Sequence, residues 1–190
     1  MSSVPLYTVL RAFYEDGKKA ELKKYGFDLV SKFSSKNIQT YFEPEKKIMI
    51  FSIKGTNPSS IPDLRTDISL AIGRLKQTKR FKDSEKMLIG AKAELKPSKT
   101  IVVGYSLGGS IASALSSYAD KVLSFNRGAT IGSTTKKNEE SYRIKGDIIS
   151  ANLSGATTLP KDRTTTDLIS PALGSHQLTQ LENDNVMIYY

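Results

Sequence analysis

The residue pattern that points most directly to chemistry in this sequence is Gly-x-Ser-x-Gly, at Gly104-Tyr-Ser-Leu-Gly108. In this pattern the serine sits on a sharp turn between a strand and a helix, so that its hydroxyl stands clear of the backbone. The flanking glycines lack the β-carbons that would collide where strand and helix cross. The N–H of Leu107 would point to a developing oxyanion at the positive end of the helix. The pattern predicts Ser106 as a nucleophile, and a turn without chemistry is the alternative.

A serine hydroxyl needs a base that removes its proton, and histidine is the usual base near neutral pH. The sequence contains one histidine, His176. It follows Ser106 in the order serine, acid, histidine that one large group of serine hydrolases uses. His176 is therefore the predicted base, although a lone histidine is more often an ordinary surface or core residue.

The base in turn needs a carboxylate that holds its tautomer and stabilises the imidazolium. Asp147 is the preferred candidate because it follows a predicted strand and a glycine, which places it at the carboxyl edge of a sheet. Asp162 and Asp167 lie in an irregular stretch and are held in reserve. The other carboxylates between the serine and the histidine are Asp120, Glu139 and Glu140.

A second oxyanion donor is expected from the loop after another central strand, and Lys54-Gly-Thr-Asn-Pro58 follows such a strand. The carboxyl ends of neighbouring parallel strands meet at one edge of a sheet, so this loop should lie beside the serine turn. The Thr56 N–H would point at the oxyanion, and its hydroxyl would add a further hydrogen bond. One such donor contributes about 3 kcal/mol to transition-state stabilisation. An ordinary turn is the alternative for this segment.

The chain must also supply the elements that bring these residues to one sheet edge. Strand and helix patterns alternate through its middle, which predicts an α/β fold: a mostly parallel central sheet with helices on both faces. The nearly continuous apolar run at 48–53 favours a central strand. The predicted strands are 38–43, 48–53, 100–103, 121–125 and 141–145, and the predicted helices are 5–35 (divided near Gly17 and Gly26), 60–73, 83–95 and the stretch after Ser106.

Three other stretches carry weaker patterns. Residues 74–86 are rich in lysine and arginine, which indicates a solvated loop or a flap over the site. Either 57–63 or 74–86 is a candidate lid. Residues 151–175 are rich in Thr, Ser, Gly and Pro and are predicted to be irregular, while 187–190 is a short strand or a docked tail.

The length of 190 residues favours one domain over 1–190, with a helical segment at about 5–35 and a hydrolase core at about 38–180. A hydrophobic content of 38% and a charged content of 25% are ordinary for a soluble globular protein. There is no cysteine, which excludes disulfides, thiolate nucleophiles and cysteine-based zinc sites. Neither a metal nor another cofactor is expected, because serine chemistry needs none.

The net charge is +9, from 28 basic and 19 acidic residues. This balance favours peripheral contact with an anionic membrane, against the alternative of a merely solvated lysine-rich surface. No basic-aromatic recognition motif is present, so no nucleic-acid partner is expected. No signal-peptide pattern or membrane-spanning run occurs, which favours an intracellular or a virus- or phage-associated protein over a classically secreted one. The oligomeric state stays open.

Taken together, residues from about 38 to 180 resemble the class 3 lipase family, the fungal-lipase-like branch of the α/β-hydrolases. The stretch Gly104-Tyr-Ser-Leu-Gly-Gly109 is similar to the family's Gly-His-Ser-Leu-Gly-Gly turn. The strand that ends at Lys54-Gly-Thr56 is similar to the family's strand ending in aromatic-Arg-Gly-Thr or Ser. Further matches are Asp63 and Asp67 to an acidic pair, Val122–Phe125 to the next strand, Gly146-Asp147 to the acid segment and Ser175-His176 to the base.

The resemblance implies a compact α/β-hydrolase-like fold, a triad of Ser106, Asp147 and His176, and an oxyanion hole formed by Thr56 and Leu107. The chain departs from the family where Lys54 replaces arginine, where Tyr105 replaces histidine, and where Asn126-Arg127 replaces Pro-Arg. It is also shorter and shows no clearly apolar lid. None of these departures removes a catalytic group.

The function expected from the residues and the resemblance is a lipase- or esterase-like serine hydrolase that cleaves carboxylic esters, with lipid esters as substrates. Phospholipid, cleaved as by a phospholipase A, is the alternative substrate class. A catalytically inactive lipase-like domain used for binding or assembly is the alternative function.

Overall fold

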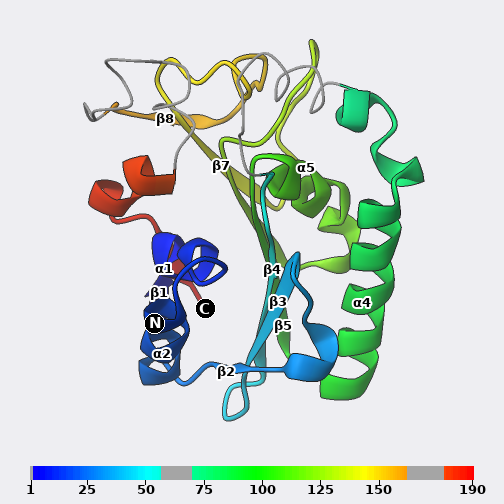
Figure 1. Cartoon of the computed structure of the whole chain (residues 1–190), viewed down its shortest axis with the longest axis vertical. Coiled ribbons are helices and arrows are strands. Elements are labelled where there is room, and N and C mark those ends of the chain that lie inside the picture. The colour runs from blue at the N-terminus through cyan, green and yellow to red at the C-terminus, as the bar shows by residue number, and fades with distance from the viewer. Residues whose placement is uncertain (1, 57–69, 162–177) are drawn as a thin grey trace.

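The computed structural model describes residues 2–56, 70–161 and 178–190, and its centre is a seven-stranded sheet (Figure 1). The strand order is β2-β3-β4-β5-β6-β7-β8. Strands β4 to β8 are parallel, while β2, β3 and β4 pair antiparallel. The strands are β2 Asp28–Leu29, β3 Ile38–Glu43, β4 Ile48–Ile53, β5 Lys99–Tyr105, β6 Lys121–Phe125, β7 Glu139–Ile144 and β8 Thr157–Leu159.

The central strand β4 shows why the sheet lies between two layers of helices. All six of its residues are buried, as expected for a strand covered on both faces. Its side chains alternate, so Ile48 and Ile50 belong to one apolar cluster and Met49 and Phe51 to the other. The mostly parallel α/β sheet predicted from the sequence is confirmed.

Helices cover both faces of the sheet (Figure 1). Helices α1 (Leu6–Arg11) and α2 (Asp16–Lys24) lie on one side, and α4 (Lys79–Leu95) and α5 (Leu107–Ala114) lie on the other. The chain ends meet beside α1, where β1 (Ser3–Pro5) pairs antiparallel with β9 (Met187–Tyr189). The structure also has short 3-10 helices, which are η1 Ser31–Phe33, η2 Leu75–Gln77, η3 Ser116–Tyr118 and η4 Leu178–Asp184.

The sequence placed several elements correctly and several wrongly. Strands β3, β4 and β6 have the predicted bounds, and β9 confirms a strand at the chain end. The predicted division near Gly26 agrees with the end of α2 at Lys24, but the helix predicted beyond it, to residue 35, is wrong, because Asp28 and Leu29 pair with Phe42 and Tyr41 at the edge of the sheet. Residues 12–15 break the first helix, whereas Gly17 lies within α2.

Two other predictions need correction. Residues 79–86 are not a loop or flap but the first half of α4, whose start is fixed when the Thr78 hydroxyl accepts a hydrogen bond from the Phe81 N–H at 3.2 Å. The stretch 151–175 is not wholly irregular, because β8 extends the sheet beside β7. Of the helix predicted at 60–73, residues 70–73 are helical and 60–69 lie outside the described residues, as does the candidate lid 57–63. Among the residues that the structure describes, no helix is long and apolar enough to span a membrane.

Candidate active site

The site is built around a strained turn at Ser106, between β5 and α5. Its backbone angles are φ 54° and ψ −123°, which a residue with a side chain seldom adopts. The turn is held because the Ser106 N–H donates to the Phe125 carbonyl at 3.0 Å and the Ser106 carbonyl accepts from the Ser110 N–H at 3.1 Å. Ser106 itself has no exposed surface. The predicted nucleophile therefore stands on the type of turn that its sequence pattern indicated.

Glycines permit the close crossing of strand and helix beneath that turn. A β-carbon on Gly104 would lie 2.2 Å from the Gly108 carbonyl oxygen. A β-carbon on Gly108 would lie 2.3 Å from the Ile53 carbonyl oxygen at the end of β4. These distances are far below van der Waals contact, so both positions of the Gly-x-Ser-x-Gly pattern require glycine for steric reasons.

The two predicted oxyanion donors lie on backbone segments that touch each other. Leu107 is the first residue of α5, so its N–H belongs to the helix end that lacks intrahelical acceptors. The loop of Thr56 packs against the serine strand, since a β-carbon on Gly55 would lie 2.5 Å from the Tyr105 ring. The Thr56 hydroxyl oxygen is buried and has no hydrogen-bond partner among the described residues. A buried hydroxyl in that state costs stability, which is consistent with a donor kept for a ligand.

Asp147 comes directly after the two-residue turn that follows β7, at the same carboxyl edge of the sheet. Gly146 reverses the chain with a φ of 88°. The buried Asp147 carboxylate accepts hydrogen bonds from the Ser150 N–H, at 2.8 Å, and from the Ser150 hydroxyl. Burial, with the negative charge of Asp147 nearby, raises the pKa of Tyr105 well above its usual value. Asp147 is thus near the residue that precedes Ser106.

The described alternatives to Asp147 are engaged elsewhere. The Asp120 carboxylate accepts from the Thr100 N–H at 2.7 Å, at the amino-terminal end of β5. Glu140 pairs with Lys121 at 2.8 Å, where β6 begins. Both lie at the sheet edge opposite Ser106, so neither is placed to orient a base beside it.

Glu139, another alternative, is the centre of a buried network. Its carboxylate accepts from Arg127 Nε at 2.7 Å and from the hydroxyls of Ser113 and Ser124, each at 2.9 Å. The Lys136 N–H donates to it at 2.9 Å. The network ties α5, β6 and the loop after β6 together. The sequence analysis did not predict the pair of Arg127 and Glu139, because nothing in the local sequence around either residue points to the other.

We expect the variant Glu139→Ala to lower the free energy of unfolding by about 3–5 kcal/mol, because it leaves the Arg127 charge buried without its partner. Urea unfolding monitored by circular dichroism measures this. The matched control is Glu140→Ala, which breaks a half-exposed ion pair with Lys121 and should change stability by less than about 1 kcal/mol. Similar losses of unfolding free energy in the two variants would show that the buried pair of Arg127 and Glu139 stabilises the protein no more than a surface ion pair does.

Arg80 is a second residue that the sequence did not single out. Its guanidinium Nη2 donates to the carbonyl of Lys54, directly before the Gly55-Thr56 loop. Burial lowers the pKa of Arg80, and its Nε has no hydrogen-bond partner within the part of the chain that the structure describes. A partly buried cation on this carbonyl restrains the loop that carries the predicted oxyanion donor. The run of lysines and arginines at 74–86 was the only sequence signal for it.

Several predicted site residues lie outside the described residues: His176, the reserve acids Asp162 and Asp167, and the acidic pair Asp63 and Asp67. The structure therefore brings together Ser106, Leu107, Thr56 and Asp147, and His176 stays a prediction. No group of three or more histidine, cysteine, aspartate or glutamate side chains is gathered to hold a metal ion within residues 2–56, 70–161 and 178–190.

Comparison with known proteins supports the fold. No protein-family model matches the sequence, and no curated protein matches it. The solved structure of the Lip2 lipase from Yarrowia lipolytica is similar to this chain, with a TM-score of 0.56 and 14% sequence identity. The match covers 83% of this chain and 77% of that lipase chain. The chain has a lipase-like α/β-hydrolase fold.

Proposed function

We propose that this protein is a serine hydrolase that cleaves carboxylic esters. The observation that carries the proposal is the strained turn at Ser106, with φ 54° and ψ −123°, at the amino end of α5. Such strain costs about 1–3 kcal/mol, and it concentrates at functional sites. Three further observations support it: the glycines that permit the turn, the buried Asp147 at the same sheet edge, and the Thr56 hydroxyl, which has no partner among the described residues.

The reaction would follow the usual steps of a serine, histidine and aspartate triad. Ser106 attacks the ester carbonyl carbon while His176 takes its proton, and Asp147 keeps His176 in the right tautomer. The N–H groups of Leu107 and Thr56 donate to the oxyanion, with the Thr56 hydroxyl as a third donor. His176 then protonates the leaving alcohol, and water releases the acid from the acyl-enzyme. The chain's own residues carry every step, with no cofactor.

Lipid esters are the substrate class we propose. The similar structure from Yarrowia lipolytica is named a lipase, and the net charge of +9 would favour ester substrates held in an anionic membrane surface. Phospholipid, cleaved as by a phospholipase A, is the specific form of this class that the charge favours. The buried position of Ser106 means that the surrounding chain must move before any substrate reaches the hydroxyl.

Labelling with a fluorophosphonate tests the proposal, because this reagent forms a bond only with an activated serine. We expect one equivalent of label on Ser106, located by peptide mass analysis, with the reaction run both with and without a neutral detergent that opens access to a buried site. Ser98, which is exposed, is the internal control for nonspecific reaction. Folded protein that stays unlabelled at Ser106 under both conditions would overturn the proposal and favour an inactive domain used for binding or assembly.

A further inference from the structure

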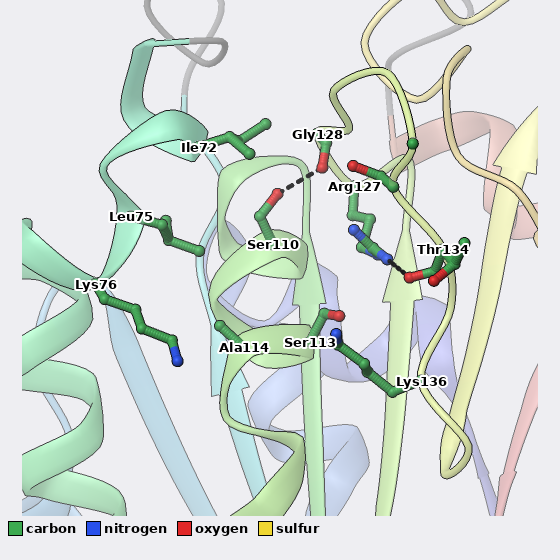
Figure 2. Close-up of a pocket in the computed structure, with 12 residues that line it drawn as sticks. Ile72, Leu75, Lys76, Ser110, Ser113, Ala114, Arg127, Gly128, Thr134 and Lys136 are labelled. Atoms are coloured by element: carbon green, nitrogen blue, oxygen red, sulfur yellow. Dashed lines mark hydrogen bonds between the residues drawn. The ribbon is translucent and has the colours of Figure 1, made fainter.

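A groove runs along α5, on the flank next to the candidate active site. It consists of two adjoining pockets with volumes of about 310 Å³ and about 330 Å³. Ile72, Leu75, Lys76 and Ala114 line both pockets, so the two adjoin, and together we call them the α5 groove. Figure 2 shows the first pocket between the 72–76 segment, α5 and the loop of 127–136.

The charged side chains that line the α5 groove are all basic. They are Arg74, Lys76, Arg127 and Lys136, and no acidic residue is found among the described lining residues. Arg127 is paired with Glu139, whereas Arg74, Lys76 and Lys136 have no ion-pair partner among the residues that the structure describes. Two of these three, Lys76 and Lys136, carry ammonium groups. These two ammonium groups extend toward α5 from opposite sides of the groove (Figure 2). The groove therefore presents three positive charges that lack an ion-pair partner in the described part of the chain.

The hydroxyl groups on the floor of the groove do not supply further donors. The Ser110 hydroxyl donates to the Gly128 carbonyl at 2.9 Å, a bond drawn in Figure 2, and the Ser113 hydroxyl donates to Glu139 at 2.9 Å. Because each hydroxyl has one proton, only their lone pairs remain. These two hydroxyls therefore offer no donor to an anion, and the basic side chains of the groove are the charged donors that it would meet.

The groove also has apolar side chains, two of them on the 72–76 segment that carries Lys76. Ile72 packs in a small cluster with Ile149, and Leu75 and Ala114 pack against the core beneath α4 and α5. The side chains of Ile72 and Leu75 are only partly buried, so each still offers apolar surface to a ligand. A ligand that contacts both the basic and the apolar side chains carries a compact negative group and a hydrocarbon chain.

We propose that the α5 groove binds an alkyl phosphate, that is, a phosphate monoester with a hydrocarbon chain. Its phosphate lies between Lys76 and Lys136, and its chain lies along Ile72 and Leu75. A phosphate monoester carries close to two negative charges near neutral pH, which matches two lysines better than the single charge of a carboxylate does. The site is separate from Ser106 and does not depend on ester hydrolysis by that residue.

Direct binding tests the proposal without any activity measurement. The probe is dodecyl phosphate, kept below its micelle concentration and titrated into the full-length protein by calorimetry. Backbone amide shifts of Ser110 and Thr134, read by NMR, report whether binding occurs at the groove. The double variant Lys76→Gln/Lys136→Gln should bind about thirtyfold more weakly, because each lysine contributes roughly fivefold. The matched control is Lys24→Gln/Lys36→Gln, which removes the same charge at exposed lysines away from the groove and should bind like the wild type.

Three comparison ligands separate the contribution of the phosphate charge to binding from that of the hydrocarbon chain. Dodecanoate should bind more weakly than dodecyl phosphate, and neutral dodecyl maltoside should not shift the Ser110 and Thr134 amides. Inorganic phosphate should also bind more weakly, because it lacks the chain. If the two double variants bind dodecyl phosphate with equal affinity, the proposed site is wrong. If inorganic phosphate binds as tightly as dodecyl phosphate, the ligand is a free phosphate and the hydrocarbon chain contributes nothing. Binding of dodecyl phosphate in the α5 groove does not depend on whether Ser106 reacts with fluorophosphonate. Either proposal can therefore be contradicted while the other stands.

Discussion

Replacing Ser106 with alanine is expected to reduce the turnover of a short nitrophenyl ester by about a million-fold, to the rate left by binding and the oxyanion hole alone. The reason is that alanine has no hydroxyl to form the acyl-enzyme, while the donors of Leu107 and Thr56 stay in place. Nitrophenolate absorbance under single-turnover and steady-state conditions measures the loss. Neutral detergent is included because Ser106 is buried.

Folding of the Ser106→Ala variant must be checked beside its activity. Alanine occupies the strained turn about as readily as serine, so the free energy of unfolding should stay within about 1 kcal/mol of the wild-type value. Ser98→Ala is the matched control, because it removes an exposed hydroxyl and should leave turnover unchanged. A folded Ser106→Ala variant that keeps wild-type turnover would rule out the serine mechanism.

The second large effect is expected from Asp147→Asn, which should lower turnover by about ten-thousand-fold. An asparagine amide keeps the size of the side chain, and its oxygen can still accept from the Ser150 N–H. It would nevertheless favour the wrong tautomer of His176 and would not stabilise the imidazolium. Because substrate binding does not use this carboxylate, the loss should appear in kcat, with KM nearly unchanged.

Other aspartates provide the controls for this prediction. Asp120→Asn alters a carboxylate at the opposite sheet edge and should leave kcat within about threefold of the wild type, since it touches none of the reacting groups. Asp162→Asn and Asp167→Asn should also have mild effects. A large loss at Asp167 with little at Asp147 would mean that the acid has been assigned to the wrong residue.

The sequence was a good guide where structure depends on neighbouring residues. Gly104 before Ser106 is required for a local steric reason, because a β-carbon there would meet Gly108 four positions further on. Gly108 is required by the distant Ile53 carbonyl, so the pattern indicates a contact that only the packed sheet explains. Strands β3 and β4 have the predicted bounds because a continuous apolar run or a two-residue alternation is itself the requirement for burial in a sheet. Glycine followed by aspartate after β7 likewise placed Asp147 at the correct edge.

The sequence was a poor guide where secondary structure is set by contacts with residues distant in the chain. Asp28 and Leu29 follow a helical pattern, but pairing with β3 makes them a strand, because ladder hydrogen bonds outweigh a weak local preference. The lysine-rich run at 74–86 gave no sign that α4 begins at Lys79, which depends on one hydroxyl cap at Thr78.

The sequence by itself therefore determined the mostly parallel α/β sheet, the serine turn and the position of Asp147 after β7, since each is encoded in local spacing. Only the tertiary structure decided that Arg127 and Glu139 form a buried pair, that Arg80 holds the carbonyl of Lys54, and that Lys76 and Lys136 face one groove. These residues come from separate elements, and their contacts exist only after the helices pack on the sheet. A sequence pattern relates residues that are close along the chain, whereas these contacts depend on which helix and strand surfaces pack together.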